Sequence, residues 1–240
     1  RQCEERAEKI FATPQLWFSS PADLNDPFEC RPQIRCGSTQ EKVMDFLVRM
    51  IRRNHPYLSE DGATAEAASI YLHGGHLHPE TRVTVRQLIV DDLAQNIGLY
   101  CLSEVNDEIL MWSHYADNHR GYCLMFAATD MTPFFGTAQK VTYSESLPVV
   151  DIANDSPHEK SEKTLLTKFC DWGYEKEWRI VDHESGSGLH SYPPELLVGV
   201  IFGAQMPTGD RAKIRGWLRL REHPVSLYEA VLSDQHFRVE

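Results

Sequence analysis

The chain has 240 residues, of which 42% are hydrophobic and 25% are charged, an ordinary composition for a globular protein. This composition excludes a disordered or fibrous chain, and the length suffices to bury a substantial core. The balance of 24 basic against 35 acidic residues gives a formal net charge of −11. A surface of that sign repels a phosphate backbone, so nucleic-acid binding is not favoured.

The predicted elements of the first half are mostly helical. Apolar residues recur at i, i+3, i+4 and i+7 in three stretches, which together predict a helical insert at about 38–96. A helix, a strand and a turn precede the insert. The turn ends before Pro27, because the residue before a proline is disfavoured in the helical region. The expected ranges are 3–12 (helix), 15–19 (strand), 20–23 (capped turn), and 39–55, 62–73 and 80–96 (helices).

The second half is richer in β-prone segments. The predicted strands are 98–103, 121–127, 139–144, 177–182, 196–202 and 225–231, and the predicted helices are 107–116, 159–171 and 207–219. No regular βαβ order and no G-x-G-x-x-G turn is present, which argues against a dinucleotide-binding parallel sheet. We predict a single α+β domain over 1–240 with a mixed or mostly antiparallel sheet.

The six cysteines contain no C-x-x-C pair, which is typical of reduced, structural thiols. No apolar run in the sequence approaches the length that spans a bilayer. We therefore expect a cytoplasmic protein without membrane contact.

The first cluster that could carry chemistry is the run LNDPFE, which contains Asn25, Asp26 and Glu29. A proline-locked turn can hold these polar side chains in fixed directions, where they could bind ligand hydroxyls. The alternative is an Asx-turn in which Asn25 or Asp26 accepts a hydrogen bond from its own backbone. Composition alone favours the Asx-turn.

The second cluster joins Ser103, at the end of a predicted strand, to the run MWSHY. Spacing of i, i+3 places Trp112 and Tyr115 on one helix face, with His114 on a neighbouring face. A single histidine in this setting is more often a packing residue, so we favour that role for His114 over catalysis. As a ligand site, the cluster would offer the Ser103 hydroxyl together with the rings of Trp112, His114 and Tyr115.

The third cluster is the run EKEWR. In a strand, Glu175, Glu177 and Arg179 share one face, while Lys176 and Trp178 share the other. Two neighbouring carboxylates could shift each other's pKa, so that one acts as a base or an electrostatic stabiliser. Arg179 could pair with either carboxylate or bind an anionic ligand group. The alternative is a ladder of ion pairs on a wet sheet face.

Three histidines at 73, 76 and 78 suggest zinc, but no cysteine or carboxylate spacing completes a ligand set. The glycine pair between them predicts a turn between helices. We expect no metal cofactor.

The runs LWFSSPADLNDPFE, YCLSEVNDEILMWSHYADNHRGYCLMF and KFCDWGYEKEWRI together resemble an uncharacterised bacterial family, a domain of unknown function. The markers of that family are similar to an FNDPFE turn, a CFS-to-MWSHYA stretch and a closing YEKEWR. Some of its members lie in phage-defence or mobile-element settings, so the resemblance is compatible with an antiviral or toxin role.

The order of strands and helices, with a serine on a middle strand and glutamates at the start of a late strand, is also similar to that of ADP-ribosyltransferases. This resemblance implies that Ser103 matches their middle-strand hydroxyl, and that Glu177, with Glu175 beside it, matches their E-x-E. Glu177 would hold the nicotinamide ribose of NAD and stabilise its oxocarbenium character, while Trp112 or Tyr115 would stack on the nicotinamide. The first strand of ADP-ribosyltransferases, which bears His or Arg, has no counterpart here, so either that strand precedes the first residue or the similarity does not hold.

Three functions follow as hypotheses. The favoured one is an NAD-dependent ADP-ribosyltransferase-like or NAD glycohydrolase-like enzyme, with a nucleotide as its small-molecule ligand. The second is a non-enzymatic sensor that binds a small ligand or a partner, with Arg179 paired to Glu177. The third is a metal-dependent hydrolase or nuclease that uses Asp26, Glu29, Glu175 and Glu177.

Overall fold

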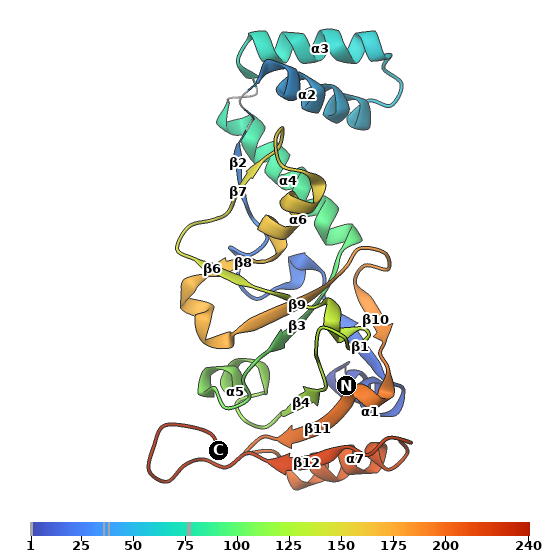
Figure 1. Cartoon of the computed structure of the whole chain (residues 1–240), viewed down its shortest axis with the longest axis vertical. Helices are drawn as coiled ribbons and strands as arrows, with labels where there is room; N and C mark the ends of the chain where they lie inside the picture. The colour runs from blue at the N-terminus through green and yellow to red at the C-terminus, as the bar shows by residue number, and fades with distance from the viewer. Residues whose placement is uncertain (1, 36, 38, 76–77) are drawn as a thin grey trace. The chain divides into compact units, whose positions relative to one another are not determined.

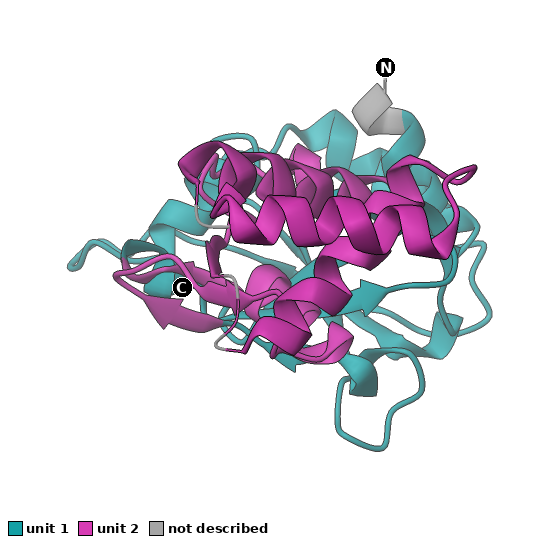
Figure 2. Cartoon of the chain, turned by 90° about the horizontal axis from the view of Figure 1, so that it is seen from above, with its two compact units in different colours: residues 1–20, 96–141, 171–240 teal, residues 21–95, 142–170 magenta. Residues whose placement is uncertain are grey.

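The computed structural model of the chain describes residues 2–35, 37, 39–75 and 78–240 (Figure 1). The chain forms two compact units (Figure 2). The first unit comprises residues 1–20, 96–141 and 171–240, and the second comprises 21–95 and 142–170. Helices and mixed sheets occur together, so the predicted α+β class is confirmed.

Among the described residues, the antiparallel strand pairs lie in the first unit. Its sheets have the orders β1-β10, β12-β11-β4 and β3-β9-β5, and only β11 and β12 pair in parallel. Its elements are α1 (Gln2–Ala12), β1 (Gln15–Phe18), β3 (Gly98–Ser103), α5 (Ile109–Tyr115), β4 (Tyr122–Phe126), η3 (Phe135–Thr137), β5 (Gln139–Lys140), η4 (Cys170–Glu175), β9 (Glu177–Asp182), β10 (Gly188–Ser191), η5 (Pro194–Leu196), β11 (Leu197–Phe202), α7 (Thr208–Leu218) and β12 (Ser226–Glu229).

Aromatic side chains dominate the core of the first unit. Phe11, Phe18 and Phe202 are essentially inaccessible to solvent, and Phe135 packs in the same cluster. Tyr100 packs against them, and this burial raises the pKa of its phenol. Large aromatic side chains remove much apolar surface from water, so they fix the sheets that carry β3 and β9.

The second unit combines parallel strand pairs with α-helices. Its strands pair as β2 with β7 and β6 with β8. Its elements are η1 (Pro21–Asp23), β2 (Gln33–Arg35), α2 (Gln40–Asn54), α3 (Glu60–Leu72), α4 (Pro79–Asn96), β6 (Thr142–Ser144), β7 (Val149–Asp151), α6 (Pro157–Leu165) and β8 (Thr167–Phe169).

The helices α2, α3 and α4 lie where the sequence predicts them. Val43, Leu47 and Ile51 form the buried stripe of α2, and the small residues Ala63 and Ala67 of α3 pack in the same cluster. Their spacing is that of an amphipathic helix, and the alanines allow close helix packing. All three helices contribute residues to the second unit's cores.

The predicted helix at 159–171 is wrong over its second half. A capping box of Ser156 and Glu159 starts α6, and the helix ends at Leu165. Thr167–Phe169 then pairs in parallel with Thr142–Ser144, a long-range contact that overrides the local helical pattern. The strands β2, β7, β8 and β10 were not predicted, because three or four residues are too few to show a clear alternation.

None of the described helices has the length and apolar character needed to cross a membrane.

Candidate functional site

Glu177 and Arg179 lie on the same buried face of β9, as predicted for the strand. Arg179 Nε lies 2.7 Å from Glu177 Oε1, and its Nη2 lies 3.0 Å from Oε2. Their side chains are 1% and 4% exposed. Such a two-point contact is the strongest geometry for an Arg–carboxylate pair, and it holds both carboxylate oxygens.

Glu175 does not share that strand face, and this part of the prediction is wrong. Glu175 ends the 3-10 helix η4, and Lys176 takes a left-handed backbone conformation with φ of 44° before β9 begins. This left-handed conformation interrupts the alternation of side chains between the two strand faces, which the prediction assumed to extend back to Glu175. Glu175 is nevertheless buried, with its Oε1 accepting a 2.6 Å hydrogen bond from the Tyr115 hydroxyl.

Ser103 stands directly opposite Glu177 in the register of β3 and β9. Its hydroxyl donates to the backbone oxygen of Glu175 at 2.6 Å and accepts from the backbone nitrogen of Val105 at 3.0 Å. The structure therefore brings Ser103, Tyr115, Glu175 and Glu177 together in the first unit. Their contacts with one another tie the end of β3 to the start of β9.

The residue after Ser103 makes a further polar contact on this edge. Glu104 Oε1 accepts from Lys140 Nζ at 3.0 Å and from Trp178 Nε1 at 2.7 Å. The bond from Lys140, followed by that from Trp178, lowers the pKa of the Glu104 carboxyl below its usual value. This contact uses the strand face opposite to Glu177, as the alternation predicts for Trp178.

The residues of α5 have different environments. Trp112 is buried and donates from Nε1 to the backbone oxygen of Asn106 at 2.7 Å, so it is a core residue. Tyr115 is half-exposed. His114 is exposed, with its ring 6.2 Å from those of Tyr115 and Trp172, and the prediction of a packing role in the core is wrong. Trp112 faces the core because the i, i+4 rows of α5 pack on β11 side chains.

The LNDPFE turn belongs to the second unit. Asn25 is exposed, and Asp26 is buried. Asp26 Oδ1 accepts from the backbone nitrogen of Phe28 at 2.8 Å, while its backbone oxygen accepts from Glu29 at 3.1 Å. The expected Asx-turn is therefore confirmed, with Asp26 as its acceptor. It directs Glu29 inward.

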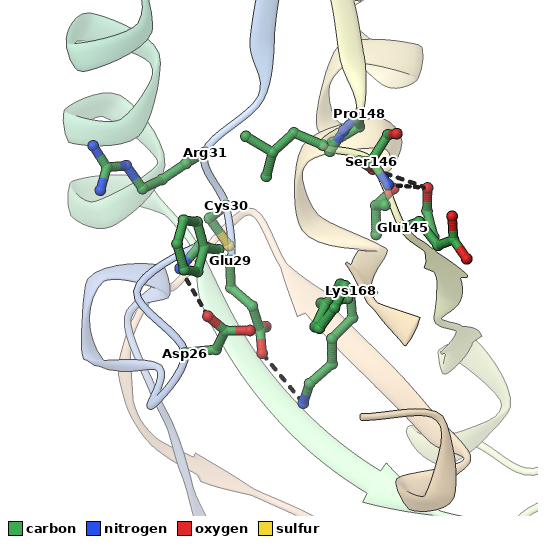
Figure 3. Close-up of a pocket in the computed structure, with 13 residues that line it drawn as sticks. Asp26, Glu29, Cys30, Arg31, Glu145, Ser146, Pro148 and Lys168 are labelled. Carbon is green, nitrogen blue, oxygen red and sulfur yellow. Dashed lines mark hydrogen bonds and ion pairs between the residues drawn. The ribbon is translucent and has the colours of Figure 1, made fainter. Parts of the chain in front are cut away.

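Glu29 meets a residue that the sequence did not single out. Its Oε1 lies 3.2 Å from Lys168 Nζ, and the two side chains are 2% and 3% exposed. Figure 3 shows them reaching toward each other, Glu29 from the turn and Lys168 from β8. Removing both charges of such an ion pair from water carries a large desolvation cost, and removing one partner leaves a buried charge without compensation.

A pocket with a volume of about 320 Å³ opens beside this ion pair, and we call it the Lys168 pocket (Figure 3). Its polar residues come from the LNDPFE turn and the residues after it, from the end of β6 and the loop that follows, and from β8. Its walls carry two phenylalanines, a leucine and a proline. The lining residues are Asp26, Phe28, Glu29, Cys30, Arg31, Ser144, Glu145, Ser146, Leu147, Pro148, Thr167, Lys168 and Phe169.

The sequence contained one overlooked signal for this pocket. Lys168 lies in the run LLTKFC, between the buried Leu166 and the half-exposed Phe169. A lysine inside an apolar run is seldom buried without a partner. The predicted helix at 159–171 includes Lys168 instead.

The zinc hypothesis for residues 73–78 cannot be traced through the structure, because His76 lies outside the described residues. Within 2–35, 37, 39–75 and 78–240, no three His, Cys, Asp or Glu side chains gather closely enough to hold a metal ion.

Residues 111–180 match the model of a family described as a protein of unknown function (DUF2971). This stretch contains the MWSHY and EKEWR runs and begins after the LNDPFE turn. The resemblance to a domain family of unknown function is therefore confirmed over this stretch. No curated protein and no solved structure matches the chain significantly.

Proposed function

We propose that this protein binds a small molecule in the Lys168 pocket and does not convert it chemically. The observation that carries this proposal is the buried Glu29–Lys168 ion pair beside a cavity of about 320 Å³. Ligand pockets in proteins combine apolar walls with a few fixed polar groups. Phe28 and Phe169 supply such walls, and the ion pair supplies the polar groups.

The geometry of the first unit supports binding over NAD chemistry. An ADP-ribosyltransferase needs its glutamate to reach a ribose hydroxyl, yet both oxygens of Glu177 contact Arg179. Glu177 would have to give up a buried two-point contact before it could hold a substrate. Ser103 is likewise engaged with the Glu175 backbone. These contacts suit a structural brace between β3 and β9.

A metal-dependent hydrolase draws still less support. Glu29 faces the Lys168 ammonium, and Glu177 faces the Arg179 guanidinium. Two of the four carboxylates named for this hypothesis therefore already neutralise a cation, and a third, Glu175, accepts a hydrogen bond from Tyr115. A cytoplasmic location and a toxin or phage-defence role stay predictions from the sequence.

The experiment that tests the proposal is a thermal-shift screen of the purified protein, followed by calorimetry. The panel contains nucleotides including NAD, free bases, sugars, amino acids and aromatic acids. We expect at least one class to raise Tm, and Phe28→Ala to weaken that effect. Phe237→Ala is the matched control, because Phe237 is fully exposed and lies in the first unit.

A parallel assay for nicotinamide release from NAD separates the two main hypotheses. The binding proposal expects no release above the buffer rate. Release that Glu177→Gln abolishes, in a variant with an unchanged circular dichroism spectrum, would overturn it in favour of NAD chemistry.

A further inference from the structure

We infer that β12 accepts an extended segment of a partner protein as an additional strand, and that this segment carries acidic side chains at alternate positions. The strand belongs to the first unit, whereas the Lys168 pocket belongs to the second, so this site goes beyond the proposed function. Three features carry the inference: the open edge of β12, the exposure of its side chains and a row of arginines on α7.

The backbone of β12 has an open edge. β12 is an edge strand of the sheet β12-β11-β4, beside α7 (Figure 1). The backbone nitrogen of Ala230 donates to the Phe202 oxygen at 2.8 Å, so the two-residue period of a strand directs the backbone groups of Tyr228 toward β11 as well. Leu227 and Glu229 direct theirs to the other side, where no described residue hydrogen-bonds them. Such an edge is a template for a further strand.

The chain itself shows that this side can take an antiparallel partner. Just beyond β12, the backbone nitrogen of Val231 donates to the Glu240 oxygen, and the Glu240 nitrogen donates to the Val231 oxygen, each at 2.8 Å. Val231 follows Glu229 by two residues, so both direct their backbone groups to the same side. The pairing extends to the bridge between Leu232 and Val239. An added strand along β12 would continue this line.

The side chains of β12 offer apolar surface at the same edge. All residues of Ser226–Glu229 are exposed, and Leu227 and Tyr228 are 40% and 50% accessible. Gly199 of β11 leaves room for the Tyr228 ring, whose Cε2 lies 3.3 Å from the place that a Cβ of Gly199 would take. Apolar side chains on the neighbouring strand would pack against Tyr228, as cross-strand pairs do within a sheet.

A row of arginines on α7 sets the charge of the partner. Arg211 Nη1 lies 3.0 Å from Glu229 Oε2, and Arg215 Nη2 lies 3.3 Å from Glu229 Oε1, so this helix face lies over β12. Arg219 follows at the same i, i+4 spacing and is exposed. The row thus sets three guanidiniums against the one carboxylate of Glu229, in a chain whose formal net charge is −11. A strand about 4.8 Å beyond β12 would bring acidic side chains within reach of the row.

The test measures binding of labelled peptides to the full chain by fluorescence anisotropy. The probe is Glu-Val-Glu-Val-Glu-Val, in which acidic and apolar side chains alternate. A second peptide has lysine in place of each glutamate, and a third is the probe with methylated backbone nitrogens, which cannot donate to a strand edge. We expect the probe to bind with a Kd below about 1 mM, and both other peptides to bind at least about tenfold more weakly.

Two pairs of variants locate the site on the protein. Leu227→Pro removes an outward N–H without removing a hydrogen bond to β11, and Leu227→Ala keeps that N–H. We expect the proline variant to abolish binding, whereas the alanine variant still binds. Arg219→Glu should weaken binding about tenfold by like-charge repulsion. Arg82→Glu is its control, because Arg82 is also exposed but lies on α4 of the second unit, and this variant should bind as the native chain does.

Each outcome decides for or against the site. The inference is overturned if the probe does not bind up to about 1 mM, or if the lysine peptide binds equally well. Binding that survives Leu227→Pro also overturns it. If that variant does not fold, the methylated peptide and Arg219→Glu decide in its place. A dimer of the native chain in light scattering that Arg219→Glu dissociates would show that a second copy occupies the edge.

Discussion

The guanidinium of Arg179 contacts both carboxylate oxygens of Glu177, at 2.7 and 3.0 Å, while the Ser103 hydroxyl opposite them bonds the Glu175 backbone. Through these contacts Glu177 and the Glu175 backbone connect β3 to β9 inside the first unit, and we call this set of contacts the brace. Its energetic role can be measured without any knowledge of the ligand.

Glu177→Ala should lower the free energy of unfolding by about 3–5 kcal/mol, because it removes the carboxylate that faces a fully buried guanidinium. The double variant Glu177→Leu/Arg179→Met should recover much of the loss. Guanidinium chloride denaturation measures both. Glu240→Ala, which removes an exposed partner of Arg238, is the control and should cost less than about 1 kcal/mol. A loss for Glu177→Ala as small as that of the control would contradict the brace.

Tyr115→Phe should destabilise the first unit by about 1–3 kcal/mol. The variant removes only the hydroxyl that donates to the buried Glu175 carboxyl at 2.6 Å. Tyr228→Phe is a matched control, because Tyr228 is also half-exposed. Urea denaturation of the two variants side by side gives the difference, and equal stability would show that the Tyr115 bond contributes nothing.

Asp182 should make the protein more stable at neutral than at acidic pH. Partial burial raises the pKa of its carboxyl, but hydrogen bonds from the backbone nitrogens of Ser185, Gly186 and Glu184 outweigh burial, so the net pKa is lowered. A lowered folded-state pKa stabilises above the ordinary aspartate pKa of about 3.9, and this stability is lost as pH falls below that value.

Asp182→Asn should therefore be less stable than the native chain at pH 7, and the gap should shrink between about pH 5 and pH 2. Urea denaturation across this pH range measures the gap. Asp234→Asn removes one acidic charge at an exposed position and serves as the control. A gap that stays constant with pH would show that the turn does not depend on the Asp182 charge.

The Glu29–Lys168 pair should resemble the Glu177–Arg179 pair in its effect on stability, but it should also affect ligand binding. Lys168→Met alone should cost about 3–5 kcal/mol, since it leaves the Glu29 carboxylate buried without its cation. The double variant Glu29→Met/Lys168→Met should be nearly as stable as the native chain, yet lose the binding of any ligand that the thermal-shift screen identifies. Denaturation and calorimetry on the same preparations separate stability from binding. Retained binding in the stable double variant would place the ligand elsewhere.

The sequence predicted the longer elements well because their hydrophobic patterns are local. The stripe of α2 and the apolar run of β11 need no distant partner to be recognised. The placement of Glu177 and Arg179 on one strand face also followed from alternation alone, whereas their burial did not. The Asx-turn at Asp26 followed from the chemistry of the residues next to Pro27.

The remaining errors come from contacts that a local pattern does not contain. Lys176 takes a left-handed conformation that lysine rarely adopts, so nothing in the run EKEWR signals the break before Glu177. Lys168 becomes buried through the parallel pairing of β6 and β8. Exposure of His114 depends on which face of a two-turn helix meets the core.

The Lys168 pocket is built from two distant stretches of chain, at positions 26–31 and 144–169. A ribosome adds roughly 5–20 residues per second, so Lys168 emerges on the order of ten seconds after Glu29. Until then the nascent chain holds the carboxylate without the ammonium, and the cavity does not exist. Any ligand that needs this pocket can therefore bind only after both stretches have been synthesised, so it cannot assist the folding of the segments made before Lys168.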